Sequence, residues 1–362
     1  MIPKWKLLRE LDRLKTHAQA IPLAVSEPFL QRRYDARRDQ DLKVYEGSLA
    51  ASDTLAIFLV YQPRGVAASV FRTCAHLVES GFAPLVISNT PLSEADRSSF
   101  QELSHCVVER PNFGYDFGGY RDGVWLMGKL GLSPKQVLFL NDSVWFPIYS
   151  HSTLLSEWRD APEDYLGTQV FGDIAASGNN RGFFGSYCFM IKTPLLDTNA
   201  FQSFWSDYRV SSNKEVTLRR GERAFSRQML DAASASKAFF SLERFDALVN
   251  ALSIAKLREA IGDLVATDPT LIAHQKAMIA AGLNHAARQE MVDLLKASAR
   301  SKNYIGAAPV LSLREMAFPM IKKNNERHYM LARKRIVKAL DEGRMIPLNP
   351  DIEEELRARD HG

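Results

Sequence analysis

Residues 54–88 read TLAIFLVYQPRGVAASVFRTCAHLVESGFAPLVIS, and this stretch decides the fold class. It opens with a run of apolar strand formers, 54–61, which is too short for most helices and is typical of a buried strand. Apolar residues then recur at helical spacing up to Gly81, a suitable helix end, before a second apolar run at 84–88. The stretch therefore predicts strand, helix and strand, the unit from which parallel sheets are built.

The same alternation continues along the chain. Ser93 and Asp96 have the pattern of a capping box for a second helix. Further strands are predicted at residues 105–110, 136–140 and 186–192. Parallel strands bind ligands beyond their carboxyl ends, so we expect chemistry just after positions 61, 89, 110 and 140.

Composition excludes several classes of protein. The 362 residues include 46 Lys and Arg against 42 Asp and Glu, and this small excess does not favour a nucleic-acid partner. Cys74, Cys106 and Cys188 have no paired spacing, which favours reduced core thiols in a cytoplasmic protein over a zinc site. The sequence has no apolar run near the ~20 residues of a membrane-spanning helix, and no signal-peptide pattern.

Residues 4–15, KWKLLRELDRLK, form an amphipathic basic pattern. Trp5, Leu8 and Leu11 recur at helical spacing among lysines and arginines. Such a helix fits peripheral contact with the inner face of the plasma membrane. A helix docked on protein through its apolar face gives the same pattern, and this second interpretation leads.

A glycine-rich segment, NFGYDFGGYRDG at 112–123, joins a predicted strand to a predicted helix. Its glycines would let backbone N–H groups approach a phosphate or nucleotide, but they also suit a tight structural turn. The spacing matches neither GxGxxG nor the Walker pattern. Asn112 and Asp116 add polar groups that could contact a base or ribose. The glycines are Gly114, Gly118, Gly119 and Gly123.

In LFLNDSVWFP, residues 138–147, an apolar strand runs directly into Asn141, Asp142 and Ser143. A carboxylate at a strand end suits Mg²⁺ or Mn²⁺, because such cations are held by one or two carboxylates plus substrate phosphates. The alternative is an Asn-Asp-Ser turn whose side chains bond the local backbone. This segment alone somewhat favours the turn.

Two later carboxylates, Glu222 and Asp173, are candidates for a general base that deprotonates an acceptor hydroxyl. Glu222 is the first choice and follows Gly221 at the start of a predicted helix, 221–230. Acids are also common in a first helical turn because they complement the helix dipole.

Together and in this order, NFGYDFGGYRDG and VLFLNDSVWFP resemble the paired signature of the rhamnan synthesis F family. In that family an Asn-x-Gly-x-Asp loop precedes a Leu-Asn-Asp-Ser-Val strand end. Residues 185–205 and AFPMIKK at 317–323 resemble further family stretches, and the family also carries a Glu near a helix start.

The resemblance implies an α/β, GT-A-like fold, a mostly parallel sheet flanked by helices with an appended helical C-terminal region. The Ala- and Leu-rich helical periodicity from about residue 242 independently predicts that region. We therefore divide the chain into an N-terminal helix and lead-in (1–50), a nucleotide-sugar glycosyltransferase domain (51–240) and a helical region (241–362).

The resemblance also implies the reaction. A sugar, with rhamnose as the first guess, would move from dTDP-rhamnose or a related nucleotide-sugar donor to a lipid-linked or polysaccharide acceptor, by inverting, metal-assisted displacement. Asn112, Gly114, Asp116 and Asn141 would line the nucleotide pocket. Asp142 would stand where GT-A enzymes keep the metal-binding carboxylate of their Asp-x-Asp motif.

Asn141 departs from that two-acid pattern and leaves a second hypothesis open. The fold could bind a sugar nucleotide or a partner enzyme without turnover, as a scaffold in polysaccharide assembly. A Rossmann-type methyltransferase or dehydrogenase is disfavoured, because residues 62–65 provide no glycine-rich turn after the first strand.

Overall fold

The computed structural model describes residues 26–172 and 182–360. Within them, a sheet of nine strands has the order β1-β4-β3-β2-β5-β9-β7-β10, with β8 paired to β7. Strands β4, β3, β2, β5, β7 and β10 run in one direction, and β1, β8 and β9 run oppositely. The predicted mostly parallel sheet is therefore confirmed.

A helix over residues 26–41 precedes the sheet. The first half of the sheet domain contains β1 (Lys43–Glu46), β2 (Thr54–Val60), α2 (Ala68–Glu79), β3 (Ala83–Ser88), α3 (Glu94–Glu102), β4 (Cys106–Glu109), α4 (Tyr115–Lys129), β5 (Gln136–Asn141), β6 (Val144–Trp145), α5 (Leu154–Asp160) and β7 (Tyr165–Phe171). Its second half contains β8 (Phe183–Phe184), β9 (Cys188–Lys192), η1 (Leu195–Asp197), α6 (Asn199–Asp207), α7 (Lys214–Thr217), the π-helical turn η2 (Leu218–Arg223), α8 (Ala224–Ala232) and β10 (Ser236–Phe240).

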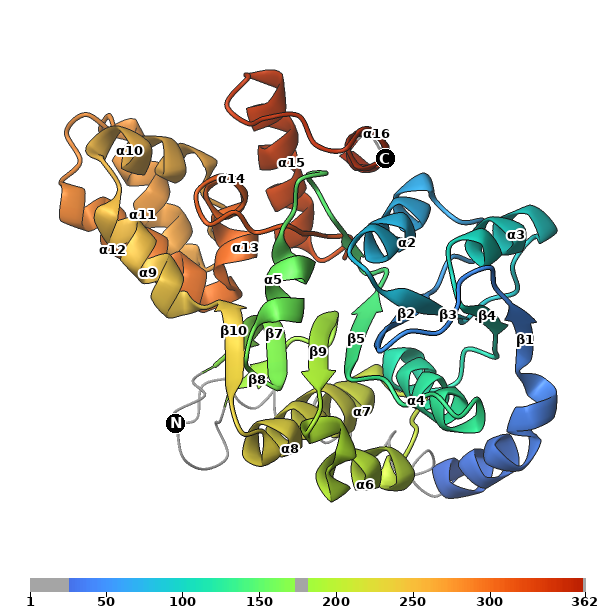
Figure 1. The fold of residues 1–362 in the computed structure, drawn as a ribbon. Coiled ribbons are helices and arrows are strands. Elements are labelled where there is room, and N and C mark those ends of the chain that lie inside the picture. Colours follow the sequence, from blue (N-terminus) through green and yellow to red (C-terminus); the bar gives the residue numbers. More distant parts are fainter. Residues whose placement is uncertain (1–25, 173–181, 361–362) are drawn as a thin grey trace.

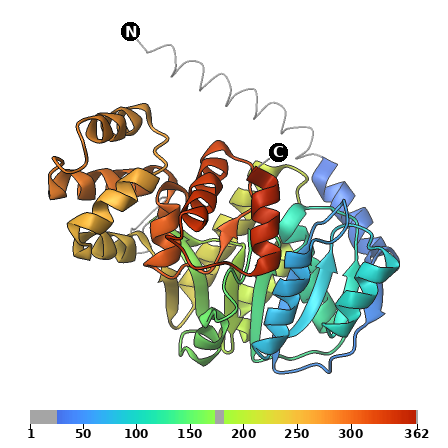
Figure 2. The same ribbon diagram turned by 90° about the horizontal axis from the view of Figure 1, so that it is seen from above.

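The C-terminal part is mainly helical, as predicted. It contains α9 (Leu242–Ala251), α10 (Ile254–Asp263), α11 (Pro269–Ala280), α12 (Arg288–Lys302), α13 (Tyr304–Ala307), α14 (Pro309–Arg314), the short strand β11 (Ile321–Lys322), α15 (Arg327–Asp341) and α16 (Pro350–Asp360). Figure 1 shows α9–α12 gathered beyond the β10 edge of the sheet. In Figure 2 the red α15 and α16 lie closer to the middle of the molecule than these orange helices.

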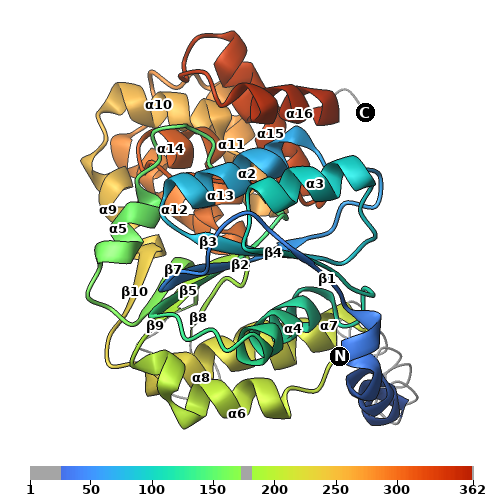
Figure 3. The same cartoon turned by 45° about the vertical axis from the view of Figure 1, so that its right-hand side comes forward.

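The apolar run of β2 is buried on both faces of the sheet, as expected for a central parallel strand. Successive side chains of a strand point to opposite faces. Phe58 and Val60 accordingly join one core, shared with α2, α5 and the C-terminal helices, whereas Ile57 and Leu59 join the other, shared with α4, α6 and α8. Figure 3 shows the two helical layers on either side of the sheet.

Other sequence predictions can be compared with the structure directly. Ser93 caps α3 by accepting a hydrogen bond from the Asp96 N–H at 3.0 Å. The three cysteines are buried and free. No helix in the described ranges is long and apolar enough to cross a membrane.

A second, two-stranded sheet brings the C-terminal part back to the end of β5. Strand β11 pairs with β6, which places Lys322 opposite Val144. Helix α16 fastens this arrangement through Glu355, whose carboxylate accepts hydrogen bonds from Ser69 and from the Trp145 indole. Residues 321–323 thereby come to lie beside a strand end that precedes them by about 180 positions in the sequence.

Candidate functional site

The amide of Asn141 ends β5 and is 3% exposed. Its Nδ2 donates to Asp116 Oδ2 at 3.0 Å, and its Oδ1 accepts from the Ser143 N–H at 3.1 Å and the Ser143 hydroxyl at 2.6 Å. The local Asn-Asp-Ser turn considered from the sequence is therefore present at Asn141. Because both ends of the amide are bonded to protein, this side chain orients Asp116, and direct contact with a cofactor stays a prediction.

Asp142 links the end of β5 to the end of β2. Its Oδ2 accepts from the Tyr61 N–H at 2.9 Å and from Gln62 Nε2 at 2.7 Å. Burial raises the pKa of Asp142, and the Gln62 hydrogen bond and the Lys323 charge oppose this rise. These contacts place Asp142 at the carboxyl ends of two adjacent parallel strands, where the sequence predicted chemistry.

Asp116 lies in the first turn of α4 and points toward the same place. Burial raises its pKa to about 6, and the charges of Asp142 and Glu222 add to this effect. Asp116 is also hydrogen-bonded to Asn141, the residue before Asp142, so carboxylates from distant segments of the chain lie near one another here.

The glycines of residues 112–123 are explained by packing. A Cβ at Gly119 would lie 2.3 Å from a Leu59 methyl carbon, and one at Gly123 would lie 2.7 Å from Ile57. These positions let α4 approach β2 closely. A Cβ at Gly118 would lie 2.0 Å from the carbonyl oxygen of Phe113, so this position also requires glycine. The structural interpretation of these three glycines is therefore favoured.

Gly114 precedes α4 with φ 84°, a left-handed conformation that suits glycine. A Cβ there would lie 2.1 Å from Val210, so packing also accounts for this residue. Asn112 is exposed on the same loop. Nucleotide contacts by Asn112 and Gly114 stay predictions.

The predicted helix start at Gly221 was wrong. Helical structure already begins at Lys214, where Asn213 caps α7, and Glu222 lies inside the π-helical turn that leads into α8. Position 221 requires glycine because a Cβ there would lie 2.5 Å from the Phe117 ring, and not because a helix begins there.

Glu222 therefore does not lie in a first helical turn, and interaction with the helix dipole does not explain it. Its Oε1 accepts from both the Ser186 N–H at 2.8 Å and the Ser186 hydroxyl at 2.9 Å. A π-turn often marks a functional position in a helix. Its charge acts on Asp116 and Lys322, which places Glu222 at the site.

Lys322 is the residue that the sequence interpretation missed. Its Nζ lies 3.3 Å from the centre of the Tyr187 ring. Burial lowers its pKa to about 7, although the charges of Glu222 and Asp116 favour the protonated form. The only signal was its place in AFPMIKK, which was quoted for the resemblance but given no chemical role.

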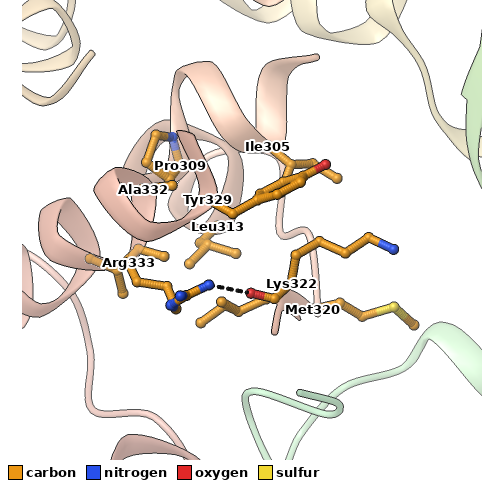
Figure 4. A pocket seen from close by; sticks show the side chains of 10 residues that line it. Ile305, Pro309, Leu313, Met320, Lys322, Tyr329, Ala332 and Arg333 are labelled. Carbon is orange, nitrogen blue, oxygen red and sulfur yellow. Dashed lines mark hydrogen bonds between the residues drawn. The ribbon is translucent and has the colours of Figure 1, made fainter. Parts of the chain in front are cut away.

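The backbone of Lys322 is held by a neighbouring helix. Arg333 donates to the Lys322 carbonyl oxygen at 3.2 Å and so holds the backbone. Figure 4 shows the lysine side chain running away from Arg333, with apolar residues around it. The cavity among those apolar residues has a volume of about 10 Å³, which is too small for a substrate.

The other two predicted strand ends serve the fold. Asn89 and Arg110 are buried, and Arg110 Nη1 donates to Asn89 Oδ1 at 2.5 Å. Arg110 Nε also donates to the buried Asp122 at 2.6 Å. The side chains of Asn89 and Arg110 are therefore used inside the structure, and chemistry in the loops that follow them stays a prediction. Asp173 and the basic segment 4–15 lie outside the described residues.

Asp142 could bind a divalent cation through one of its two carboxylate oxygens. Among residues 26–172 and 182–360, no group of three or more His, Cys, Asp or Glu side chains is arranged to hold a metal. Both hydrogen bonds to the carboxylate go to Oδ2 in this part of the chain, which leaves Oδ1 for a cation. Such a cation would take its remaining ligands from substrate phosphates and water, as Mg²⁺ commonly does.

Several known proteins are similar to this chain. The uncharacterized protein y4gN of Sinorhizobium fredii (strain NBRC 101917 / NGR234) is 26% identical over 341 residues, covering 93% of this chain and 88% of that protein. The solved mannosyltransferase Ktr4p from S. cerevisiae is 10% identical with a TM-score of 0.31, over 53% of this chain and 70% of its own. Mannosyltransferase PcManGT from Pyrobaculum calidifontis, solved in complex with GDP-Man and Mn²⁺, is 15% identical with a TM-score of 0.27, over 89% and 98%.

TM-scores this low do not establish a shared fold or function. The model of the family described as rhamnan synthesis protein F, by contrast, matches residues 85–339, well over half of the chain. This range includes the loop of Asp116, the strand end of Asp142, the π-turn of Glu222 and the strand of Lys322. The chain therefore belongs to the rhamnan synthesis protein F family, a glycosyltransferase-like family.

Proposed function

We propose that this protein transfers a sugar from a nucleotide-sugar donor to a growing cell-surface polysaccharide or lipopolysaccharide. The donor of first choice is dTDP-rhamnose, in keeping with the family's name. One observation carries the proposal. Asp116, Asp142 and Glu222 converge with Lys322 at the carboxyl ends of central parallel strands, where α/β proteins bind their ligands.

The donor's diphosphate meets positive charge at this site. The charges of Glu222 and Asp116 act on Lys322, which has no ion-pair partner within hydrogen-bonding distance among the described residues, so its ammonium group can bind a phosphate oxygen. A divalent cation held by Asp142 would add Lewis-acid neutralisation of the leaving diphosphate. Fixed positive groups that face a developing negative charge lower the barrier to its departure.

Glu222 is the base in this proposal. Its Oε1 is fixed by the two bonds from Ser186, so Oε2 can accept the proton of an acceptor hydroxyl. The acceptor oxygen forms a bond to the anomeric carbon as the bond to the diphosphate breaks, and the diphosphate leaves with the electron pair. Displacement from the opposite side inverts the anomeric centre. Asp173 is the alternative base.

Asp116 contributes a carboxylate whose position is fixed by Asn141. Its location at the start of α4, after the loop with Asn112 and Gly114, suits contact with the ribose or base of the donor. Asn141 supports that contact by holding Asp116 in place.

The test is a panel of nucleotide sugars, first by thermal shift with and without Mg²⁺ or Mn²⁺, and then by release of nucleoside diphosphate with an oligosaccharide acceptor. A ligand that binds only the native state raises the melting temperature. Stabilisation by one donor, together with diphosphate release that depends on acceptor, supports the transferase. Binding without release identifies the sugar-nucleotide-binding scaffold, and a silent panel contradicts both.

A further inference from the structure

A separate cavity of about 170 Å³ lies between segments 149–157, 239–244 and 316–319, apart from the cluster formed by Asp116, Asp142, Glu222 and Lys322. For comparison, an apolar cavity of about 150 Å³ accommodates one benzene ring. The volume therefore suits a single six-membered ring and is below the range of pockets for larger ligands. The residues that line the cavity include Tyr149, His151, Glu157, Phe239, Arg244 and Ala317.

The lining combines ring faces with polar groups. The Tyr149 and His151 rings stack with centres 5.5 Å apart and an angle of 12° between their planes. Phe239 adds a third ring, while Glu157 supplies a carboxylate and Arg244 a guanidinium. A pyranose sugar has apolar C–H faces that pack on aromatic rings and hydroxyl groups that bond to charged side chains. This chemistry matches a sugar unit.

Two backbone features characterise the walls of the cavity. The Arg244 guanidinium donates to the carbonyl oxygens of Phe239 at 2.6 Å and Met316 at 3.2 Å, so it ties the end of β10 to the segment before β11. Ala317 on the rim has φ 54°, a left-handed conformation that is strained for a residue with a Cβ. Backbone strain of this kind clusters at binding sites.

The sheet places this cavity at a defined position relative to the cluster. Phe240 pairs with Gln169 of β7, and the register across β7 and β9 makes it level with Asn141 at the end of β5. Three strand spacings separate β10 from β5, which corresponds to ~14 Å. An oligosaccharide bridges this distance, but a single sugar does not.

The opposite half of the sheet carries the loop proposed for the nucleotide. That loop, 110–114, follows β4, whereas the cavity adjoins the end of β10, and β5 lies between these strands in the sheet. A donor bound over β4 and β2 would therefore reach the cluster from one side. The cavity is reached from the other side.

We propose that this cavity binds a sugar unit of the acceptor glycan, a few units away from the hydroxyl that reacts. The inference rests on the proposed transferase function and extends it to the choice of acceptor. Short acceptors reach the cluster but not the cavity, so the cavity makes the enzyme prefer a chain that has already been started.

The test compares rhamno-oligosaccharides of two and six units with two cavity variants. His151→Ala removes an exposed ring, and Phe239→Leu keeps apolar bulk but removes an aromatic face. We expect the KM for the six-unit acceptor to rise about tenfold, the factor for a loss of about 1.4 kcal/mol, with kcat and the two-unit KM unchanged. His285→Ala and Phe29→Leu, at exposed positions away from the cavity, are the matched controls.

Direct binding separates this inference from the proposed function. In wild type, the six-unit sugar should shift the imidazole NMR signal that His151→Ala removes, and dTDP alone should not. Such binding without any sugar transfer contradicts the transferase and leaves the glycan site standing. The inference is overturned if the six-unit sugar does not bind, if dTDP shifts that signal, or if both variants keep the wild-type preference for the longer acceptor.

Discussion

Asp116→Asn should make the protein more stable while it removes activity. The substitution keeps an oxygen that can accept the hydrogen bond from Asn141 Nδ2, now 3.0 Å long, and removes the charge. In the native protein that charge is partly buried and lies close to the charges of Asp142 and Glu222, which disfavour it. A carboxylate kept at such a cost suits a site whose ligand or cation compensates the charge when bound.

The magnitude follows from the pKa of Asp116. Folding raises it from 3.8 to about 6, roughly two units, and each unit corresponds to about 1.4 kcal/mol. The native state binds this proton more tightly than the unfolded chain does. The protein therefore loses stability as pH rises from about 4 through 6, by up to ~3 kcal/mol, and solvent contact of the partly exposed side chain makes this an upper bound. Asparagine does not titrate, so the variant escapes this loss.

The assay is urea unfolding followed by tryptophan fluorescence at pH 5 and pH 7.5. The free energy of unfolding of the variant, relative to wild type, should increase by about 1–2 kcal/mol between these pH values. Asp197→Asn, at an exposed position, should show no such pH-dependent difference. Sugar transfer by Asp116→Asn is measured in parallel and should be lost.

A variant whose stability relative to wild type is the same at both pH values would refute the buried-charge argument. A variant that keeps normal transfer would instead refute the placement of Asp116 in the site. The two results are independent, so each part of the reasoning is tested separately.

Further predictions address the remaining site and fold. Asp142→Asn should abolish donor turnover without unfolding the protein, and unchanged turnover, or full wild-type activity in EDTA, would remove the metal role. Glu222→Gln should lower the transfer rate by ~100-fold or more at constant donor affinity, whereas a near-normal rate would assign the base to the alternative carboxylate. If the basic segment 4–15 contacts the membrane, deletion of residues 1–16 should weaken binding to anionic vesicles, and salt should weaken binding of the intact chain; equal binding with and without the segment would exclude membrane contact through it. Gly119→Ala places a Cβ 2.3 Å from a leucine side chain of β2 and should lower the free energy of unfolding by ~1–3 kcal/mol in urea titrations. Gly128→Ala should not destabilise, because beyond its own helix backbone no atom lies within 4 Å of the added Cβ.

The central part of the fold could be read from the sequence because its strands are buried on both sides. Residues 54–60 and 136–141 contain uninterrupted apolar runs for this reason, and the structure confirms both strands. Strand β1 escaped prediction because it is a four-residue edge strand with a half-exposed valine, Val44. Strand β7 also escaped prediction, because Gly167 interrupts its apolar pattern. A Cβ at this position would lie 2.4 Å from the Phe184 ring.

The candidate site was predictable only where its residues follow long strands. Asp142 follows β5, so its position was clear from the sequence. Lys322 depends on the pairing of β6 with β11, and strands of two residues have no detectable periodicity. Glu222 was found, but the start of its helix was predicted wrongly. In the sequence, a glycine required by a neighbouring ring looks the same as a glycine at a helix boundary.

The distant origin of Lys322 has a consequence for the growing polypeptide. All strands of the main sheet lie between residues 43 and 240, whereas the lysine is added at position 322. A nascent chain on the ribosome thus holds every segment of the sheet, and the carboxylates around it, before the ammonium group exists. Until then the proposed donor site lacks the ammonium group that would bind a phosphate oxygen of the donor. The proposed site is therefore complete only when strand β11 has paired with β6.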